Sequence, residues 1–195
     1  MKSQDIKLKM LAEILFGRHY AVAVTECSIF HGVADVLGVT KAGSSHEIEV
    51  KCSKQDLKSE LDCLDILFRE KKQEKYLQKL WKHKYYLDKF LKDPSMFDKG
   101  NYGNFYRSIY STPENIPNKF SFCVTPELKD YAKESLKDTP YGLYVAYDNH
   151  VTEVKTPEYL HKEKLSDKHK MQLLRKTSTE IYYTRAELHS LKTTS

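Results

Sequence analysis

Residues 46–52 read His-Glu-Ile-Glu-Val-Lys-Cys, and this stretch decides the fold. Charged residues at positions 47, 49 and 51 alternate with apolar residues at positions 48, 50 and 52. Side chains of a β-strand point alternately to the two faces of the sheet. The stretch therefore predicts a strand with one charged face, which carries Glu49 and Lys51, and one apolar face.

The segments on either side of this strand predict an α/β protein. Apolar residues spaced three and four apart indicate helices, and short apolar or alternating runs bounded by turn residues indicate strands. Ser53 is a good N-cap for the helix that follows the quoted strand. Three consecutive strands flanked by helices favour a mixed central sheet with helices on both faces. The expected elements are a helix over 3–16, strands from 21, over 31–40 and over 46–52, a helix from 54 that resumes up to about 92, a strand over 120–124, a helix from 125, strands over 141–147 and 151–154, and a helical polar tail from 164.

Composition excludes several classes of protein. The chain has 195 residues, of which 40% are hydrophobic and 30% charged, as in an ordinary globular domain, so a single domain over 1–195 is expected. No run of ~18 apolar residues occurs, and the N-terminus lacks the pattern of a signal peptide, so we expect a cytoplasmic protein with no membrane partner. The four cysteines include no C-x-x-C pair, which argues against a zinc ribbon or an iron–sulfur cluster. Cys52 and Cys123 lie in apolar runs and are expected to be buried thiols.

A candidate metal site follows from the pairing of the second and third strands. Asp35 lies in the second strand, and a hairpin brings it beside Glu49. Two neighbouring carboxylates repel each other unless a cation lies between them, and hard oxygen ligands suit Mg²⁺ or Mn²⁺. The backbone carbonyl of Val50 is a third candidate ligand. Such an ion activates a water molecule for attack on a phosphodiester, and Lys51 is placed to orient that water or to stabilise the developing charge. The alternative is a solvent-exposed ion pair on a strand, worth ~0–1 kcal/mol.

These residues resemble the signature of the PD-(D/E)XK nuclease superfamily. Asp35, followed after a turn by Glu49-Val50-Lys51, matches its acidic and lysine positions, whereas Ala34 stands where the signature has proline. The chain is also similar to the MmcB-like family of DNA-repair nucleases. Three stretches carry that similarity: residues 33–37 (VADVL) resemble its RADVL strand, residues 49–57 (EVKCSKQDL) its EIKSSxxDF junction, and residues 118–126 (NKFSFCVTP) its DxFYFxVP strand.

The resemblance covers about residues 5–160 and implies a restriction-endonuclease-like core. That core has a mixed central sheet in the order αβββαβ, here with an extra C-terminal hairpin and helix. Relative to the family, insertions are expected near 58–80 and 93–117, and the polar tail from about 165 has no counterpart. The implied activity is that of a Mg²⁺- or Mn²⁺-dependent DNA repair or DNA-processing nuclease.

The same resemblance suggests further site residues. Lys82 and Tyr86 lie four residues apart and resemble the family's KWxxY motif, which implies contact with the nucleic-acid backbone. The alternative for this pair is a surface lysine beside a tyrosine at the edge of the core. Glu13 in the first helix and Glu26 after the first strand are candidates for an auxiliary carboxylate, and Glu13 is also read as an ordinary solvated helix residue.

Two functions therefore follow from the sequence. The first is metal-dependent hydrolysis of DNA phosphodiesters by Asp35, Glu49 and Lys51, with Asp35, Glu49 and Val50 holding the metal. The second is a catalytically inactive, nuclease-like module that binds nucleic acid. An RNA substrate remains open, because a net charge of +5 is compatible with either nucleic acid and demands neither.

Overall fold

The computed structural model describes residues 2–14, 20–30, 33–61 and 116–193 of the chain. Within these ranges the elements follow the order that the sequence predicts, so the αβββαβ core order is confirmed. They are α1 (Ser3–Ala12), β1 (Tyr20–Cys27), β2 (Ala34–Thr40), β3 (Ser45–Lys51), α2 (Lys54–Leu61), β4 (Lys119–Val124), the 3-10 helix η4 (Pro126–Leu128), α7 (Lys129–Leu136), β5 (Gly142–Ala146), β6 (Val151–Lys155) and α8 (Asp167–Thr193).

The strands form one mixed sheet in the order β1-β2-β3-β4-β5-β6. β2 is antiparallel to both β1 and β3, and β6 is antiparallel to β5. Between them, β3, β4 and β5 run parallel. The carboxyl ends of these three parallel strands therefore lie at one edge of the sheet, which is where ligands commonly bind in α/β proteins.

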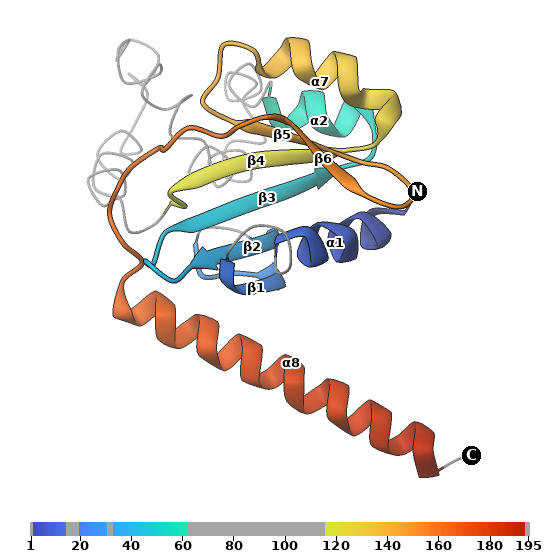
Figure 1. The fold of residues 1–195 in the computed structure, drawn as a ribbon, viewed down its shortest axis with the longest axis vertical. Helices are drawn as coiled ribbons and strands as arrows, with labels where there is room; N and C mark the ends of the chain where they lie inside the picture. Colours follow the sequence, from blue (N-terminus) through green and yellow to red (C-terminus); the bar gives the residue numbers. More distant parts are fainter. Residues whose placement is uncertain (1, 15–19, 31–32, 62–115, 194–195) are drawn as a thin grey trace, which may run out of the picture.

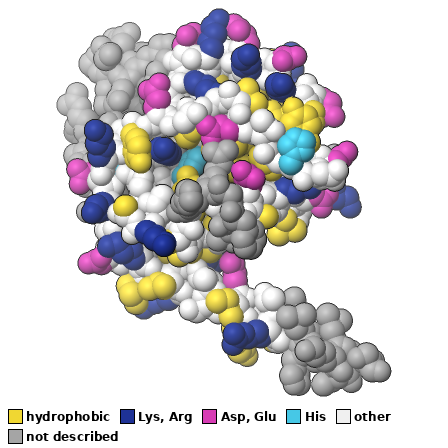
Figure 2. All heavy atoms as spheres, in the orientation of Figure 1, with side chains coloured by type: hydrophobic (Ala, Val, Ile, Leu, Met, Phe, Trp, Pro, Cys, Tyr) yellow, Lys and Arg dark blue, Asp and Glu magenta, His cyan; other side chains and the backbone are white. Residues whose placement is uncertain are grey.

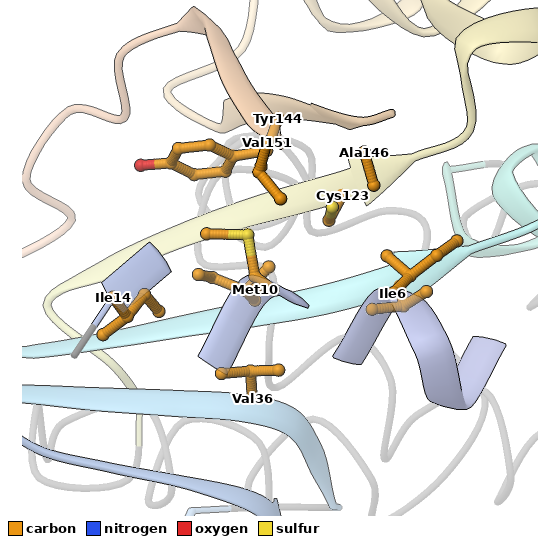
Figure 3. Packing of buried hydrophobic residues seen from close by; sticks show 10 residues of the cluster. Ile6, Met10, Ile14, Val36, Cys123, Tyr144, Ala146 and Val151 are labelled. Atoms are coloured by element: carbon orange, nitrogen blue, oxygen red, sulfur yellow. The ribbon is translucent and has the colours of Figure 1, made fainter. Parts of the chain in front are cut away.

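Helices cover both faces of this sheet (Figure 1). On one face, the N-terminal helical segment packs against apolar side chains of β2, β4 and β5 (Figure 3). Its contacts come from Ile6 and Met10 of α1 and from Ile14 just after it. On the other face, α2 and α7 cover the phenylalanines of β4 together with Leu143 and Val145 of β5. Figure 1 shows α8 extending away from the body, and only its first turns join the core, through Leu173 against β1 and β2.

Local sequence signals explain where several elements begin. The Ser53 hydroxyl oxygen accepts a hydrogen bond from the Asp56 backbone N–H at 3.1 Å, which caps α2 as expected. Gly43 has φ +83° in the turn between β2 and β3, a conformation that glycine adopts without steric cost. Pro126 opens the helical segment that continues into α7.

The structure corrects three details of the expected fold. The second strand begins at Ala34 rather than at His31, and the first strand runs from Tyr20 to Cys27. Cys52 is exposed, so its expected burial is wrong, whereas Cys123 is buried as expected. The reason is that β3 ends at Lys51, which leaves Cys52 beyond the covered part of the sheet. In the described ranges, no helix has both the length and the apolarity needed to span a membrane.

Candidate functional site

The pairing of β2 with β3 brings the two predicted carboxylates to adjacent strands. Val36 pairs with Ile48 and Leu37 with Glu47. Continuing this antiparallel register by one residue places Asp35 opposite Glu49. Both residues lie where β2 begins and β3 ends, at the carboxyl edge of the parallel strands.

The Asp35 carboxylate is fixed by two groups. Its Oδ2 accepts a hydrogen bond from the Val50 backbone N–H at 2.8 Å, and its Oδ1 lies 2.7 Å from Nζ of Lys7 in α1. Lys7 also forms an ion pair with Glu26, which has φ +50° at the end of β1. Burial lowers the pKa of Lys7, but the hydrogen bonds and charges of Asp35 and Glu26 outweigh it, so the net shift is upward. We call Lys7, Glu26 and Asp35 the Lys7 group.

A second ion-pair group lies next to the Lys7 group, around Glu49 and Lys51 of β3. Ile48 and Val50 belong to the cluster under α1, so strand alternation directs Glu49 and Lys51 toward α2. Lys51 Nζ lies 3.4 Å from Oε2 of Glu49 and 3.4 Å from Oε2 of Glu60 in α2. Their side chains are only 8% (Lys51), 8% (Glu49) and 3% (Glu60) exposed. We call Glu49, Lys51 and Glu60 the Lys51 group.

The charge state of Lys51 follows from this burial and these partners. Burial lowers the pKa of Lys51, but Glu60 and Glu49 outweigh that effect and raise the pKa above its ordinary value. Lys51 is therefore an ammonium cation at neutral pH. Such a group stabilises negative charge and does not act as a general base.

The two groups meet at Val50. Its N–H is bound to Asp35, and its neighbours Glu49 and Lys51 belong to the other group. The sequence predicts a single polar cluster at an edge or cleft of the sheet. The structure instead pairs Asp35 with Lys7 of α1, and Lys51 with Glu49 and with Glu60 of α2, as two ion-pair groups at one strand end.

The residues that the sequence predicts as metal ligands can now be placed. In the described part of the chain, no three or more His, Cys, Asp and Glu residues form a metal-binding group. The predicted oxygen donors are the carboxylates of Asp35 and Glu49 and the carbonyl of Val50. The Val50 carbonyl points to the Asp35 side, because the N–H and C=O of one strand residue face the same neighbour. Hard oxygen donors suit Mg²⁺ and Mn²⁺. The ammonium of Lys7 holds one Asp35 oxygen, so a metal ion there competes with it.

The other predicted site residues divide into three cases. Glu26 lies near Asp35, because Lys7 contacts both. Glu13 follows the last residue of α1, six positions after Lys7 and so about 9 Å farther along the helix axis. Lys82 and Tyr86 lie outside the described residues.

Sequence reasoning missed Lys7 and Glu60, the two helix residues that pair with the predicted site. A signal for Glu60 was present. Glu60 follows Leu57 by three positions and directly precedes Leu61, and both leucines are buried. Glu60 is therefore a carboxylate on the apolar stripe of α2, where a buried charge needs a partner. Lys7 directly follows Ile6, the first residue of the apolar stripe of α1, and nothing in the sequence singles it out from Lys9, the other lysine of that helix.

Comparison with known proteins supports the fold. No protein-family description matches the chain, and neither does any curated protein. Among solved structures, the chain is similar to SPO1766 from Silicibacter pomeroyi, a protein of unknown function, with a TM-score of 0.53 and 16% identity. The match covers 98% of this chain and 94% of that one. At this identity the likeness shows the fold alone: an α/β domain with a six-stranded mixed sheet flanked by helices.

Proposed function

We propose that this chain is a Mg²⁺- or Mn²⁺-dependent phosphodiesterase that acts on DNA. The observation that carries the proposal is the end of β3, where Asp35 is bound to the Val50 N–H and a buried, protonated Lys51 lies beside Glu49. The same residues carry the resemblance to PD-(D/E)XK nucleases in general and to MmcB-like proteins in particular. The order of the elements around them also supports it.

Each residue has a distinct role in this proposal. Asp35, Glu49 and the Val50 carbonyl hold the ion, and the hydrogen bond from the Val50 N–H fixes the orientation of Asp35. When bound, the ion polarises the phosphodiester and lowers the pKa of a water molecule. Lys51 supplies fixed positive charge where negative charge develops on the phosphate. Glu60 keeps Lys51 protonated and in position.

DNA as the substrate rests on the resemblance and is compatible with the surface. On the face drawn in Figure 2, lysine and arginine side chains are interspersed with aspartate and glutamate. Phosphate contacts to such a surface are therefore local rather than spread over one broad basic patch. RNA remains the alternative polymer, to be tested beside DNA.

Cleavage of plasmid and short oligonucleotides in Mg²⁺ or Mn²⁺ tests the proposal. Asp35→Asn and Glu49→Gln preserve the side-chain shape, and each is expected to lower the cleavage rate by about 100-fold or more, the scale for losing one preorganised charge-stabilising group. Asp130→Asn is the matched control, since Asp130 is an exposed carboxylate on α7, and should leave the rate unchanged. Cleavage that survives both Asp35→Asn and Glu49→Gln would refute the proposal.

One observation favours a second candidate, a nuclease-like module that binds nucleic acid without turnover. Lys7 holds the Asp35 carboxylate, and the Lys51 group is buried, so the amine cations already present stabilise these carboxylates. This candidate predicts DNA binding without cleavage. Calorimetric titration with Mn²⁺ separates the two, because the module binds no metal that depends on Asp35 and Glu49.

A further inference from the structure

A cleft of about 330 Å³ lies beyond the ends of β4 and β5. Residues 125–127, which follow β4, form one side, and residues 147–150, the turn between β5 and β6, form the other. Its volume is at the lower end of the range for small-ligand sites, about 300–1,000 Å³. The cleft therefore suits one small group rather than a long polymer segment.

Part of the lining is a stacked aromatic pair. The rings of Tyr147 and His150 have centroids 4.8 Å apart and planes tilted by only 16°. The turn is fixed by a hydrogen bond from the Tyr147 N–H to the His150 carbonyl at 2.8 Å, and Lys9 of α1 donates to the Tyr147 carbonyl at 3.1 Å. His150 is exposed, so the pair presents an aromatic ring to solvent. Aromatic rings held in this way are platforms on which nucleobases stack.

The polar lining selects against phosphate. Glu127 and Asp148 are exposed carboxylates in the cleft. The hydrogen bond with the Thr125 side chain lowers the pKa of the Glu127 carboxyl, which keeps it ionised. Ionised carboxylates only accept hydrogen bonds, so they suit the exocyclic amino groups of adenine, cytosine and guanine and repel phosphate. Thymine has no exocyclic amino group.

The cleft lies at the same edge of the sheet as the candidate catalytic residues. Lys51 pairs with Val124, and Val124 pairs with Val145. Thr125 and Tyr147 follow these two partners within two residues. Two strand spacings of about 4.8 Å separate β3 from β5, so the cleft lies roughly 10 Å from Lys51. That distance corresponds to about three nucleotides at the 3.4 Å rise of a stacked strand.

We propose that this cleft binds an unpaired, amino-bearing nucleobase of the DNA strand whose phosphate lies at the end of β3. The base stacks on the Tyr147–His150 pair and donates hydrogen bonds to Glu127 or Asp148. The choice of DNA rests on the proposed function, but base binding itself needs neither metal nor cleavage. A duplex hides its base faces, so the site favours single-stranded DNA or frayed ends.

Fluorescence anisotropy in EDTA tests base binding apart from cleavage. The probes are labelled dA12, labelled dT12 and a blunt hairpin duplex, each with the full chain. Wild-type protein is expected to bind dA12 more tightly than dT12. Tyr147→Ala and His150→Ala should each weaken dA12 binding by roughly 5- to 100-fold, the scale of one base–aromatic stack, and change duplex binding less than twofold. His150→Phe should retain dA12 binding, because it keeps a stacking ring.

Tyr159→Ala is the matched control. Tyr159 is an exposed aromatic residue whose ring lies 4.4 Å from Nζ of Lys119, at the start of β4 and therefore at the opposite edge of the sheet. Its removal should leave dA12 binding unchanged. Should Tyr147→Ala unfold the protein, His150→Ala decides the question, because His150 is exposed on the turn.

The outcomes separate this proposal from the proposed function. Loss of dA12 binding in the cleft variants, with Tyr159→Ala binding normally, supports the base site whether or not DNA is cleaved. Equal binding of dA12 and dT12, equal losses on dA12 and duplex, or no loss in His150→Ala would overturn it. Absence of cleavage alone counts only against the nuclease.

Discussion

The Lys7 group and the Lys51 group each consist of one lysine and two carboxylates, and their surroundings are very different. Each places one lysine between two carboxylates at the end of β3. In the Lys7 group the side chains of Lys7, Asp35 and Glu26 are 13%, 18% and 49% exposed. In the Lys51 group no side chain exceeds 8%. One group is open to water at Glu26, and the other is sealed beneath α2.

The difference in exposure indicates which of the two groups can exchange its lysine ammonium for another cation. Charges that keep contact with water interact weakly and rearrange at little cost, whereas removing one partner of a buried ion pair leaves an uncompensated charge in the interior. The open Lys7 group is thus where an incoming metal ion or phosphate can displace an ammonium. In the buried Lys51 group, Lys51 and Glu60 supply fixed charge and stability, and Glu49 is the one member that the proposed function assigns to the metal ion.

The largest expected effect tests this division directly. Lys51→Met keeps most of the side-chain volume but leaves Glu49 and Glu60 without that ammonium, so we expect a loss of about 3–5 kcal/mol in the free energy of unfolding. Lys7→Met should cost about 1 kcal/mol, because its partners retain access to water. Urea unfolding of both variants, followed by circular dichroism, measures the two losses. Similar losses in the two variants would show that the groups do not differ as proposed.

A smaller effect measures how well water is excluded next to Val50, where the two ion-pair groups meet. It concerns the thiols of Cys123 and Cys52. Cys123 pairs with Val50 and is buried, and burial raises the pKa of its thiol to about 12, with Cys52 adding to the shift. Because its pKa is raised on folding, the thiol stabilises the folded protein below pH ~9, and this contribution is lost as the pH rises toward 12. At 1.36 kcal/mol per pKa unit, the free energy of unfolding of the wild-type protein should fall by about 2 kcal/mol by pH 10.5 because of the Cys123 thiol.

Cys123→Ala isolates that contribution. Urea unfolding measures the free energy of unfolding at pH 8 and at pH 10.5. Its decrease between the two pH values should be smaller in Cys123→Ala than in wild type. Cys52→Ala is the comparison variant. The pKa of the Cys52 thiol is also raised, but Cys52 is exposed, so its removal should change the pH dependence less than Cys123→Ala does. Identical pH dependence in wild type and Cys123→Ala would mean that water reaches the sheet at this position.

The smallest expected effect concerns competition at Asp35. Lys7→Met removes the ammonium that lies 2.7 Å from Oδ1 of Asp35, so Mn²⁺ should bind roughly fivefold more tightly, the scale of about 1 kcal/mol for charges a few ångströms apart in water. Lys9→Met removes the same charge from the same helix but from a residue bonded to the Tyr147 carbonyl, and should change the affinity less. Isothermal titration calorimetry measures both. An equal gain in both variants would indicate a general charge effect rather than competition at Asp35.

Much of the fold could be predicted because its signals are local. The alternation over residues 46–52 correctly put Ile48 and Val50 on one face, where α1 covers them. The same rule failed at Cys52, since alternation assigns a face but does not say where a strand ends or how far its covering helix reaches. Ser53 capped α2 as expected, because a cap depends on a side chain and backbone only a few residues apart.

The candidate site could be predicted only in part. Asp35 and Glu49 belong to consecutive antiparallel strands, so their neighbourhood follows from the hairpin. Their partners Lys7 and Glu60 come from two helices on different faces of the sheet. No sequence pattern distinguishes Lys7 from Lys9, the other lysine of α1. The cleft was even harder to predict from the sequence. Its two sides, residues 125–127 and 147–150, come together only through the parallel pairing of β4 with β5.

The sequence by itself determined the order of the elements, the apolar face of β3 and the acidic and basic residues at the end of β3. Only the tertiary structure decided that these charges form an open and a sealed group, and that an aromatic cleft lies on the same edge. The physical reason is that strand and helix patterns arise from neighbours a few residues apart. Charge partners and cavities depend instead on which distant surfaces pack together, and on how much water that packing removes.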